Sequence, residues 1–224
     1  MADDVEPPRR GRPPRLSIEE RRAAILDSAC ELFARGGRET TTVAAVAQRA
    51  GLQKPSVYRL YPSKDDLYRA TVEREVERFT TLLVELYGAT SGQPLADRIR
   101  ARATGVVQHV AAEPSGMALL TRALRTWPDD ALDEGLGLRA RVLDVLARFA
   151  HDEAERDGVS LGPAAVAMAA VTFGLTQAVV ELAVDDDRWS VDQLAELLSE
   201  TAVAALTRSD PAIWVALGAT STGA

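Results

Sequence analysis

Apolar residues recur at spacings of three and four along almost the whole chain of 224 residues, which is the period of an amphipathic α-helix. Glycines and prolines interrupt this pattern at intervals, as they do between helices. No stretch shows the alternation of apolar and polar residues that predicts a half-buried strand. The sequence therefore predicts an all-α fold.

The first three predicted helices lie close together in the sequence. A capping box at residues 17–20 starts the first, which should end near residue 35 at a pair of glycines. The second is short and closes at Gly51. The third is expected over residues 54–61, with Pro55 in its first turn, where the missing N–H costs nothing. Three short helices within about 45 residues, with a glycine turn before the third, have the spacing of a helix-turn-helix.

The remaining helices are expected to be longer. One should begin at residue 63 or 64 and end between Gly88 and Gly92, which is long enough to connect two parts of the chain. The others are expected over residues 95–112, 115–126, 128–157 with a break at 135–137, 163–184, and 190–208, which starts with a second capping box.

Charge is distributed unevenly along the chain. The net charge of −7 taken alone argues against binding to nucleic acid. Residues 1–64, however, hold 12 Lys+Arg and 8 Asp+Glu, a charge of +4, whereas residues 65–224 hold 14 and 25, a charge of −11. Since non-specific affinity for DNA comes from neutralised phosphates, this pattern indicates that the first part of the chain meets a polyanion.

The helix expected over residues 54–61 carries side chains suited to DNA. Val57 and Tyr61, four residues apart, should point inward. Arg59 has the planar fork that matches guanine O6 and N7, a contact worth roughly 1 to 3 kcal/mol of discrimination. Lys54 could meet phosphate or a base edge, and the other polar groups could hold the backbone. The residues expected to contact DNA here are Thr41, Thr42, Lys54, Pro55, Ser56, Tyr58, Arg59, Lys64, and Leu60, which could touch a thymine methyl.

This region resembles the TetR family of transcriptional regulators. The motifs that carry the resemblance are Leu32-Phe33 with Gly37, Thr41-Thr42, Ala47 to Gly51, and the run from Val57 to Leu67. Together they span residues 20–70, and their combined order and spacing are specific. The resemblance implies a homodimer that reads a palindromic operator, an effector pocket in the C-terminal part, and ligand-triggered release from DNA. Family members commonly have glycine in place of Pro55 and an aromatic residue or histidine in place of Leu60, so the base preference does not carry over.

We therefore predict four segments. Residues 1–16 should form a disordered basic arm, 17–63 a helix-turn-helix DNA-binding domain, 64–208 a larger helical domain for effector binding and dimerisation, and 209–224 a C-terminal tail. In the arm, the Arg-Gly-Arg-Pro core with Arg10 and Arg12 looks like an AT-hook for a narrow minor groove. The alternative for the arm is a solvated, proline-rich tail.

Two sets of residues in the larger domain are candidates for function. The effector candidates are His109, Met117, Thr121, Arg125, Trp127, Met168, Phe173 and Gln177, although residues of these kinds on helices belong more often to the core or the surface than to a ligand site. The dimer candidates on the last two long helices are Ala167, Ala170, Gly174, Leu194, Leu197, Leu198 and Ala205; the alternative is that these helices complete the core of one subunit. Two-fold pairing would place the two recognition helices roughly 34 Å apart, one DNA turn.

Other classes of function find little support in the sequence. His109 and His151 lie in no catalytic motif, and a polar helix face explains His151 with Glu155 better than a metal site does. Cys30 has no partner and is expected to pack inside a helix bundle. We expect no enzyme, no cofactor and no metal. No secretory signal is apparent, and no apolar run approaches the roughly 18 residues of a membrane span, so we expect a cytoplasmic protein.

The sequence thus predicts a ligand-responsive DNA-binding regulator, with a repressor favoured, which a small-molecule effector releases from its operator. The effector would act by shifting the long helix over residues 64–87. The alternative is a dimer that binds small molecules or proteins and whose N-terminal domain is vestigial.

Overall fold

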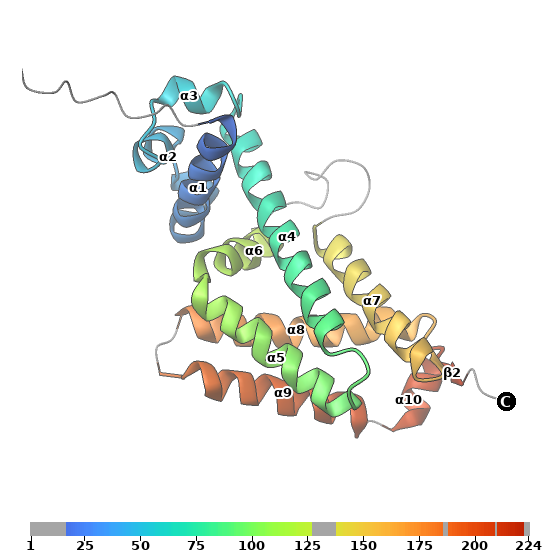
Figure 1. Ribbon diagram of the computed structural model, residues 1–224. Coiled ribbons are helices and arrows are strands. Elements are labelled where there is room, and N and C mark those ends of the chain that lie inside the picture. Colours follow the sequence, from blue (N-terminus) through green and yellow to red (C-terminus); the bar gives the residue numbers. More distant parts are fainter. Residues whose placement is uncertain (1–16, 127–137, 186–187, 209, 222–224) are drawn as a thin grey trace, which may run out of the picture.

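The computed structural model describes residues 17–126, 138–185, 188–208 and 210–221, and these form ten helices and one short pair of strands (Figure 1). The predicted all-α fold is confirmed. In chain order the elements are α1 Ile18–Thr40, α2 Val43–Arg49, α3 Lys54–Tyr58, α4 Lys64–Ala89, α5 Leu95–Ala112, α6 Pro114–Thr126, α7 Leu138–Arg156, β1 Val159–Ser160, α8 Ala164–Asp185, α9 Val191–Thr207, α10 Pro211–Ala216 and β2 Thr220–Ser221.

Local capping interactions set the starts of three of these helices. At α1 the Ser17 hydroxyl accepts from the Glu20 amide at 3.1 Å, and the Glu20 carboxylate accepts from the Ser17 amide at 2.7 Å. The same reciprocal pattern begins α4 at Ser63 and α9 at Ser190. The predicted glycine stop is also present, because Gly37 has φ +73° and kinks α1 before its last three residues.

Helices α1, α2 and α3 form a small bundle at one end of α4 (Figure 1). Its core contains the fully buried side chains of Ile25, Phe33, Val46 and Val57. The Phe33 ring packs edge-on against Tyr68 of α4, with ring centroids 4.9 Å apart. This contact fixes the small bundle to the first turns of α4.

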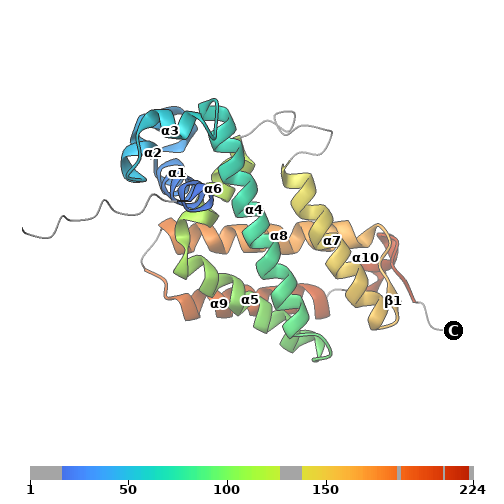
Figure 2. The same ribbon diagram turned by 45° about the horizontal axis from the view of Figure 1, so that its top comes forward.

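Helix α4 continues from the small bundle into a second group of helices, α5 to α9 (Figures 1 and 2). In both views α8 and α9 run side by side, and α5 lies along α9. Leu194 and Leu198 of α9 are buried there against Ala103 and Val107 of α5. This second group supplies most of the apolar core outside the α1–α3 bundle.

Residues 211–221 are ordered, whereas the sequence predicted only a tail. The Asp210 carboxylate caps α10 by accepting from the Ala212 amide at 2.9 Å. Trp214 packs against the main core, and β2 pairs antiparallel with β1, Val159 opposite Ser221. A six-residue helix and two-residue strands are too short for a periodic pattern, so sequence spacing could not predict them.

Helix α8 corrects the expectation that no segment is apolar enough for a membrane span. Residues Ala164–Ala183 have a mean hydropathy of 1.6, and by length and composition alone this stretch could cross a membrane. It packs, however, against α5, α6, α7 and α9. Only 28% of the stretch is buried, and Val166 and Val171 lie on its uncovered face, about half exposed. An apolar surface therefore remains on α8.

Candidate DNA-binding surface and effector cavity

The α3 surface presents two cations to solvent. Helix α3 ends at Tyr58, three residues earlier than predicted, and the buried Val57 anchors it to the core. Lys54 and Arg59 are exposed, as are Pro55 and Tyr58. The Lys54 ammonium lies 5.5 Å from the centre of the Tyr58 ring. No carboxylate within 4 Å of either cation is found in the described part of the chain, so both remain available to a polyanion.

Two of the predicted DNA contacts lie differently from the expectation. Leu60 is half buried and packs against the core, because the chain leaves the helix at Tyr58 and the helical spacing no longer applies. Thr41 is buried, and its hydroxyl donates to the Leu32 carbonyl at 3.1 Å. Leu60 is therefore not on the outward face, and Thr41 does not reach the surface.

Lys64, Thr42 and Ser56, which were also predicted to contact DNA, make local hydrogen bonds. The Lys64 ammonium donates to the carbonyls of Arg38 and Glu39 at 2.9 and 3.3 Å, so it caps the end of α1. Thr42 is exposed and caps α2 by accepting from the Ala45 amide. Ser56 is half buried and accepts from the Arg59 guanidinium at 3.2 Å. The arginines expected in the N-terminal arm, Arg10 and Arg12, lie outside the described residues, and contact of any of these residues with DNA stays a prediction.

A cavity of about 610 Å³ lies in the second group of helices, enclosed mainly by α4, α5, α7, α8 and the α10–β2 segment. Most of its lining is apolar, including Leu83, Val106, Leu146 and Trp214. Its volume is within the range of pockets that bind small molecules. The α10–β2 segment that the sequence predicted as a tail thus completes one wall.

Charged side chains form one end of this cavity. Arg98 and Arg102 on α5 face Glu153 and Asp157 near the end of α7. Arg102 binds Glu153 with both terminal nitrogens, at 2.6 and 2.5 Å, and Arg98 donates to Asp157 at 2.5 Å. This hydrogen bond from Arg98 lowers the pKa of the Asp157 carboxyl. We call these four residues the charged cluster.

An aromatic pair supports the charged cluster from the side. The Arg102 guanidinium lies over the Tyr87 ring at 3.7 Å, and Tyr87 stacks on Phe149 with ring centroids 4.5 Å apart. Burial raises the pKa of the Tyr87 hydroxyl. The sequence analysis missed the cluster, although the pairs 98/102 and 153/157 each share the i, i+4 spacing of one helix face.

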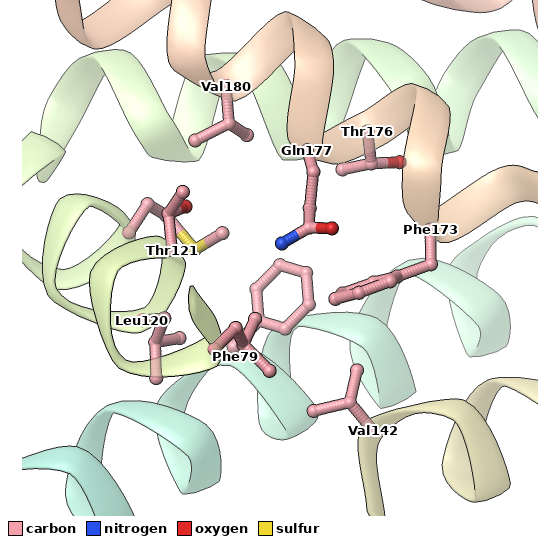
Figure 3. Close-up of a pocket in the computed structure, with 10 residues that line it drawn as sticks. Phe79, Leu120, Thr121, Val142, Phe173, Thr176, Gln177 and Val180 are labelled. Atoms are coloured by element: carbon pink, nitrogen blue, oxygen red, sulfur yellow. The ribbon is translucent and has the colours of Figure 1, made fainter. Parts of the chain in front are cut away.

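A second, much smaller cavity of about 20 Å³ adjoins the first (Figure 3). Phe79, Phe173 and Thr176 line both cavities and so form the wall between them. In Figure 3 the Gln177 side chain points towards the Phe79 ring. Four of the eight effector candidates line this small cavity: Met117, Thr121, Phe173 and Gln177.

The other effector candidates lie elsewhere. Met168 lines the large cavity. His109 is half buried on α5 and lines neither cavity. The side chain of Arg125 and the whole of Trp127 lie outside the described residues. The structure therefore brings together five of the eight candidates, in two adjoining cavities.

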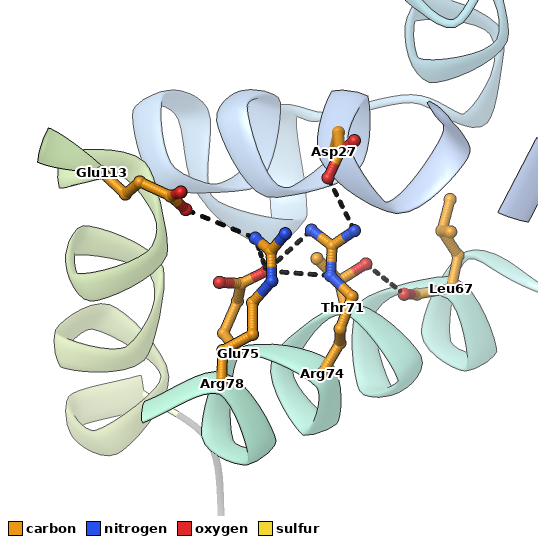
Figure 4. A network of polar contacts seen from close by, with 7 residues as sticks. All are labelled: Asp27, Leu67, Thr71, Arg74, Glu75, Arg78 and Glu113. Atoms are coloured by element: carbon orange, nitrogen blue, oxygen red, sulfur yellow. Dashed lines mark hydrogen bonds and ion pairs between the residues drawn. The ribbon is translucent and has the colours of Figure 1, made fainter. Parts of the chain in front are cut away.

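A polar network joins α1, α4 and α6 beside the small cavity (Figure 4). Arg74 of α4 binds both Asp27 of α1 and Glu75, at 2.7 Å each. Glu75 is 4% exposed and also lies 3.7 Å from Arg78, which reaches Glu113 just before α6 at 3.4 Å. Since these groups connect the α1–α3 bundle with the helices around the cavities, we call them the junction network.

The predicted dimer residues divide into two groups. Leu194 and Leu198 are buried in a core shared with α5, so within one subunit they do not form a free surface. Gly174 and Leu197 are exposed, while Ala167, Ala170 and Ala205 are half buried. Val166 and Val171, which the sequence analysis did not select, are the larger exposed apolar side chains on α8.

Neither the pair of His151 and Glu155 nor Cys30 indicates a catalytic or metal site. His151 Nε2 and Glu155 Oε1 are 4.0 Å apart on the surface of α7, which fits a polar helix face. Across the residues that the structure describes, no three His, Cys, Asp or Glu side chains gather closely enough to hold a metal ion. Cys30 is buried in the α1 core, as expected of a packing residue.

Residues 25–71 match the family model described as "Bacterial regulatory proteins, tetR family". The chain is 28% identical over 106 residues to the HTH-type transcriptional activator FasR of Mycolicibacterium smegmatis, covering 47% of this chain and 48% of the relative. It is 42% identical over 60 residues to the HTH-type transcriptional repressor KstR of Rhodococcus jostii, covering 27% and 28%. The matched segments thus span less than half the length of either relative.

The likeness in structure extends beyond the matched sequence. A solved TetR-like transcriptional regulator from Rhodococcus sp. RHA1 superposes with a TM-score of 0.66 at 24% sequence identity. The match covers 87% of this chain and all of that one. It shows that the two proteins share a fold.

Proposed function

Because the chain belongs to the TetR family through its N-terminal DNA-binding domain, we propose that it is a cytoplasmic, ligand-responsive transcriptional repressor. It binds a palindromic operator as a homodimer and leaves the operator when an effector occupies the cavity. The observation that carries this proposal is that one helix, α4, connects the DNA-facing bundle to the cavity wall. We assign residues 17–63 to DNA binding and 64–208 to effector binding and dimerisation.

The DNA-binding step uses the α3 surface. Lys54 and Arg59 are exposed cations on an anchored short helix, and Arg59 can make the bidentate contact that guanine offers in the major groove. Tyr58 and Thr42 lie on the exposed surface around them, where contacts to phosphate fix the register. Phosphate contacts supply affinity and base contacts supply specificity.

Dimerisation uses the uncovered face of α8 and the adjacent α9. Val166, Val171 and Gly174 of α8 and Leu197 of α9 form an exposed, mostly apolar strip. An exposed apolar strip between helices favours association with a second copy. Two copies paired by a two-fold axis would form a four-helix bundle and present two α3 helices to the two operator half-sites.

Effector and operator binding are coupled through α4 and α6. Phe79, Leu83 and Tyr87 of α4 line the large cavity, while Arg74 on the same helix binds Asp27 of α1. A ligand that shifts α4 therefore moves the attachment of the DNA-binding bundle. A coupling free energy of about 1 to 3 kcal/mol is enough for such control.

The test compares three alanine variants in titrations of labelled DNA from upstream of the gene and of a scrambled duplex. Arg59→Ala should lose roughly 1 to 3 kcal/mol of affinity for the upstream fragment and little for the scrambled one, because it removes a base contact. Lys64→Ala should weaken both duplexes alike and reduce the salt dependence by about one ion. Arg148→Ala removes an exposed arginine of α7, far from α3, and should leave both affinities unchanged.

Equal losses for Arg59→Ala on the two duplexes would contradict a base-reading role for α3. A wild-type protein that shows no preference among genomic fragments at low ionic strength would contradict the proposed function itself. In that case the alternative, a ligand-binding dimer with a vestigial N-terminal domain, would take its place.

A further inference from the structure

Arg98 carries a buried hydrogen-bond donor with no acceptor. The residue is 6% exposed, and its Nε is the one buried side-chain nitrogen or oxygen without a hydrogen-bond partner among the described residues. Glu153 Oε1 lies 3.8 Å from this nitrogen, which is an ion-pair distance but too long for a hydrogen bond. A buried donor left unpaired is costly, so a group that accepts from it would be held firmly.

The charged cluster around this donor is electrically balanced. Arg98 and Arg102 carry two positive charges, and Glu153 and Asp157 carry two negative charges at distances of 2.5 to 3.8 Å. An anionic ligand would therefore find no uncompensated positive charge and would come close to two carboxylates. A neutral acceptor meets no such penalty.

The rest of the cavity lining is mostly apolar, and its other polar side chains are those of Tyr87, Thr172, Thr176, Trp214 and Thr220. Among its polar lining, the Thr172 and Thr176 hydroxyls each donate to a carbonyl one turn back on α8, at 2.9 Å. The side chains between them and the charged cluster are largely aliphatic or aromatic. The volume of about 610 Å³ lies within the range of pockets that bind small molecules and is ample for an extended apolar group.

We infer that the effector is a neutral amphipathic molecule with a hydrogen-bond acceptor, such as a ketone or ester carbonyl, at one end. The carbonyl oxygen accepts from Arg98 Nε after a small movement of the charged cluster opens this buried atom to the cavity, and the apolar body extends between α4 and α8 towards Phe79 and Phe173. This inference rests on the proposed function only in identifying the cavity as the effector site.

The experiment measures binding of ten-carbon probes to the full-length protein without DNA, by calorimetry. Decan-2-one supplies a neutral acceptor, decanoate an anion, decylammonium a cation, and decanoyl-coenzyme A a large anionic headgroup. Decan-2-one should bind at least tenfold more tightly than each charged probe, because only it supplies an acceptor without adding charge to a balanced cluster. Tighter or equal binding of any charged probe would overturn the inference.

Two substitutions separate the donor from the charge balance. Arg98→Lys keeps the positive charge and removes Nε, and it should weaken decan-2-one binding about tenfold. Arg100→Lys is the matched control, since Arg100 lies on the same helix but is exposed and pairs with Glu200. Asp157→Asn leaves Arg98 in place and makes the cluster net positive, so it should strengthen decanoate binding several-fold with little effect on decan-2-one.

A spectroscopic signature distinguishes a direct contact from a merely structural role. The infrared band of ¹³C-labelled decan-2-one carbonyl should move to lower wavenumber on binding and should move back in Arg98→Lys but not in Arg100→Lys. The inference would be overturned if the band of the probe bound to Arg98→Lys had the same wavenumber as that of the probe bound to the wild type. It would also be overturned if no neutral probe from eight to fourteen carbons bound. Operator binding by the same protein sample, measured separately, would then show that the proposed function survives that failure.

Discussion

Cys30 illustrates how strongly the α1 core is closed to solvent. Its side chain is 5% exposed, and burial, followed by the charge of Glu75, raises the pKa of the thiol to about 12. The thiolate is the reactive form of cysteine, so this thiol should be inert in the folded protein. Its place among apolar side chains fits a packing role.

We predict that a thiol reagent such as dithionitrobenzoate modifies Cys30 only on unfolding. The folded pKa lies above the unfolded value of about 9, so the stabilisation from the protonated thiol is complete below pH 9 and is lost as the pH rises towards 12. Between pH 8 and pH 10 the free energy of unfolding should fall by roughly 1.4 kcal/mol more in the wild type than in Cys30→Ala. Urea denaturation at both values measures this difference, and parallel losses in the two proteins would contradict it.

Single residues were predictable from sequence where burial depends on a regular local spacing. Val57 and Cys30 are buried as expected, because each lies on the apolar face of its own helix. Leu60 differs, since the helix that set the expected spacing ends before it. Thr41 looked like a surface residue beside Thr42, yet a contact with the Leu32 carbonyl, nine residues back, draws it into the core.

Among helices and strands, the first residue of a helix was predicted correctly where a local capping interaction determines it. Ser17 and Ser190 bind within their own first turns, so the sequence alone contains the signal. The α10–β2 segment depends on packing of Trp214 and on pairing with β1, which lie far away in sequence. The Arg98–Asp157 pair spans 59 residues, and only the relative placement of α5 and α7 brings it together.

Helix α6 offers a test of the junction network. A Cβ atom added at Gly116 would lie 2.7 Å from the Glu75 carboxylate, which Arg74 and Arg78 hold in a buried position. We expect Gly116→Ala to destabilise the protein by about 1 to 2 kcal/mol, because overpacking outweighs the better helix propensity of alanine. Gly88→Ala in α4 is the control, since a Cβ there has no neighbour within 4 Å and should be neutral or stabilising.

Thermal and urea unfolding of the two variants measures the effect. The Gly116→Ala variant should also change the amount by which an effector weakens operator binding, because the network joins the two sites. A variant as stable as the wild type and with unchanged effector response would show that the junction network does not carry the coupling.

At the scale of the whole molecule, the uncovered face of α8 is the proposed dimer interface. Leucines occur on both faces of α9, and the sequence could not separate Leu194 and Leu198, which α5 covers, from Leu197, which is exposed. Helix packing makes this division, and it leaves Val166 and Val171 as the exposed apolar side chains of α8. The resemblance in sequence covers the DNA-binding part and so could not identify them.

We predict that Val171→Glu abolishes dimerisation at micromolar concentration, because it buries a charge in an apolar contact. The wild type should sediment as a dimer, and the variant should sediment as a monomer with at least tenfold weaker operator binding. Val84→Glu is a matched control, since Val84 on α4 is 52% exposed and Val171 is 48% exposed. A dimeric Val171→Glu protein, or a monomeric wild type, would exclude this face as the interface.

The wall between the two cavities makes the response to a ligand depend on the length of that ligand. A molecule too long for the larger space would gain room by turning the Phe79 ring, which lines both spaces. Phe79 lies one helical turn beyond Glu75, whose carboxylate lies where a Cβ atom added at Gly116 of α6 would be only 2.7 Å away. The protein would thus respond to the length of a bound ligand as well as to its presence. Short analogues would occupy the cavity without moving α4, the helix that carries the α1–α3 bundle.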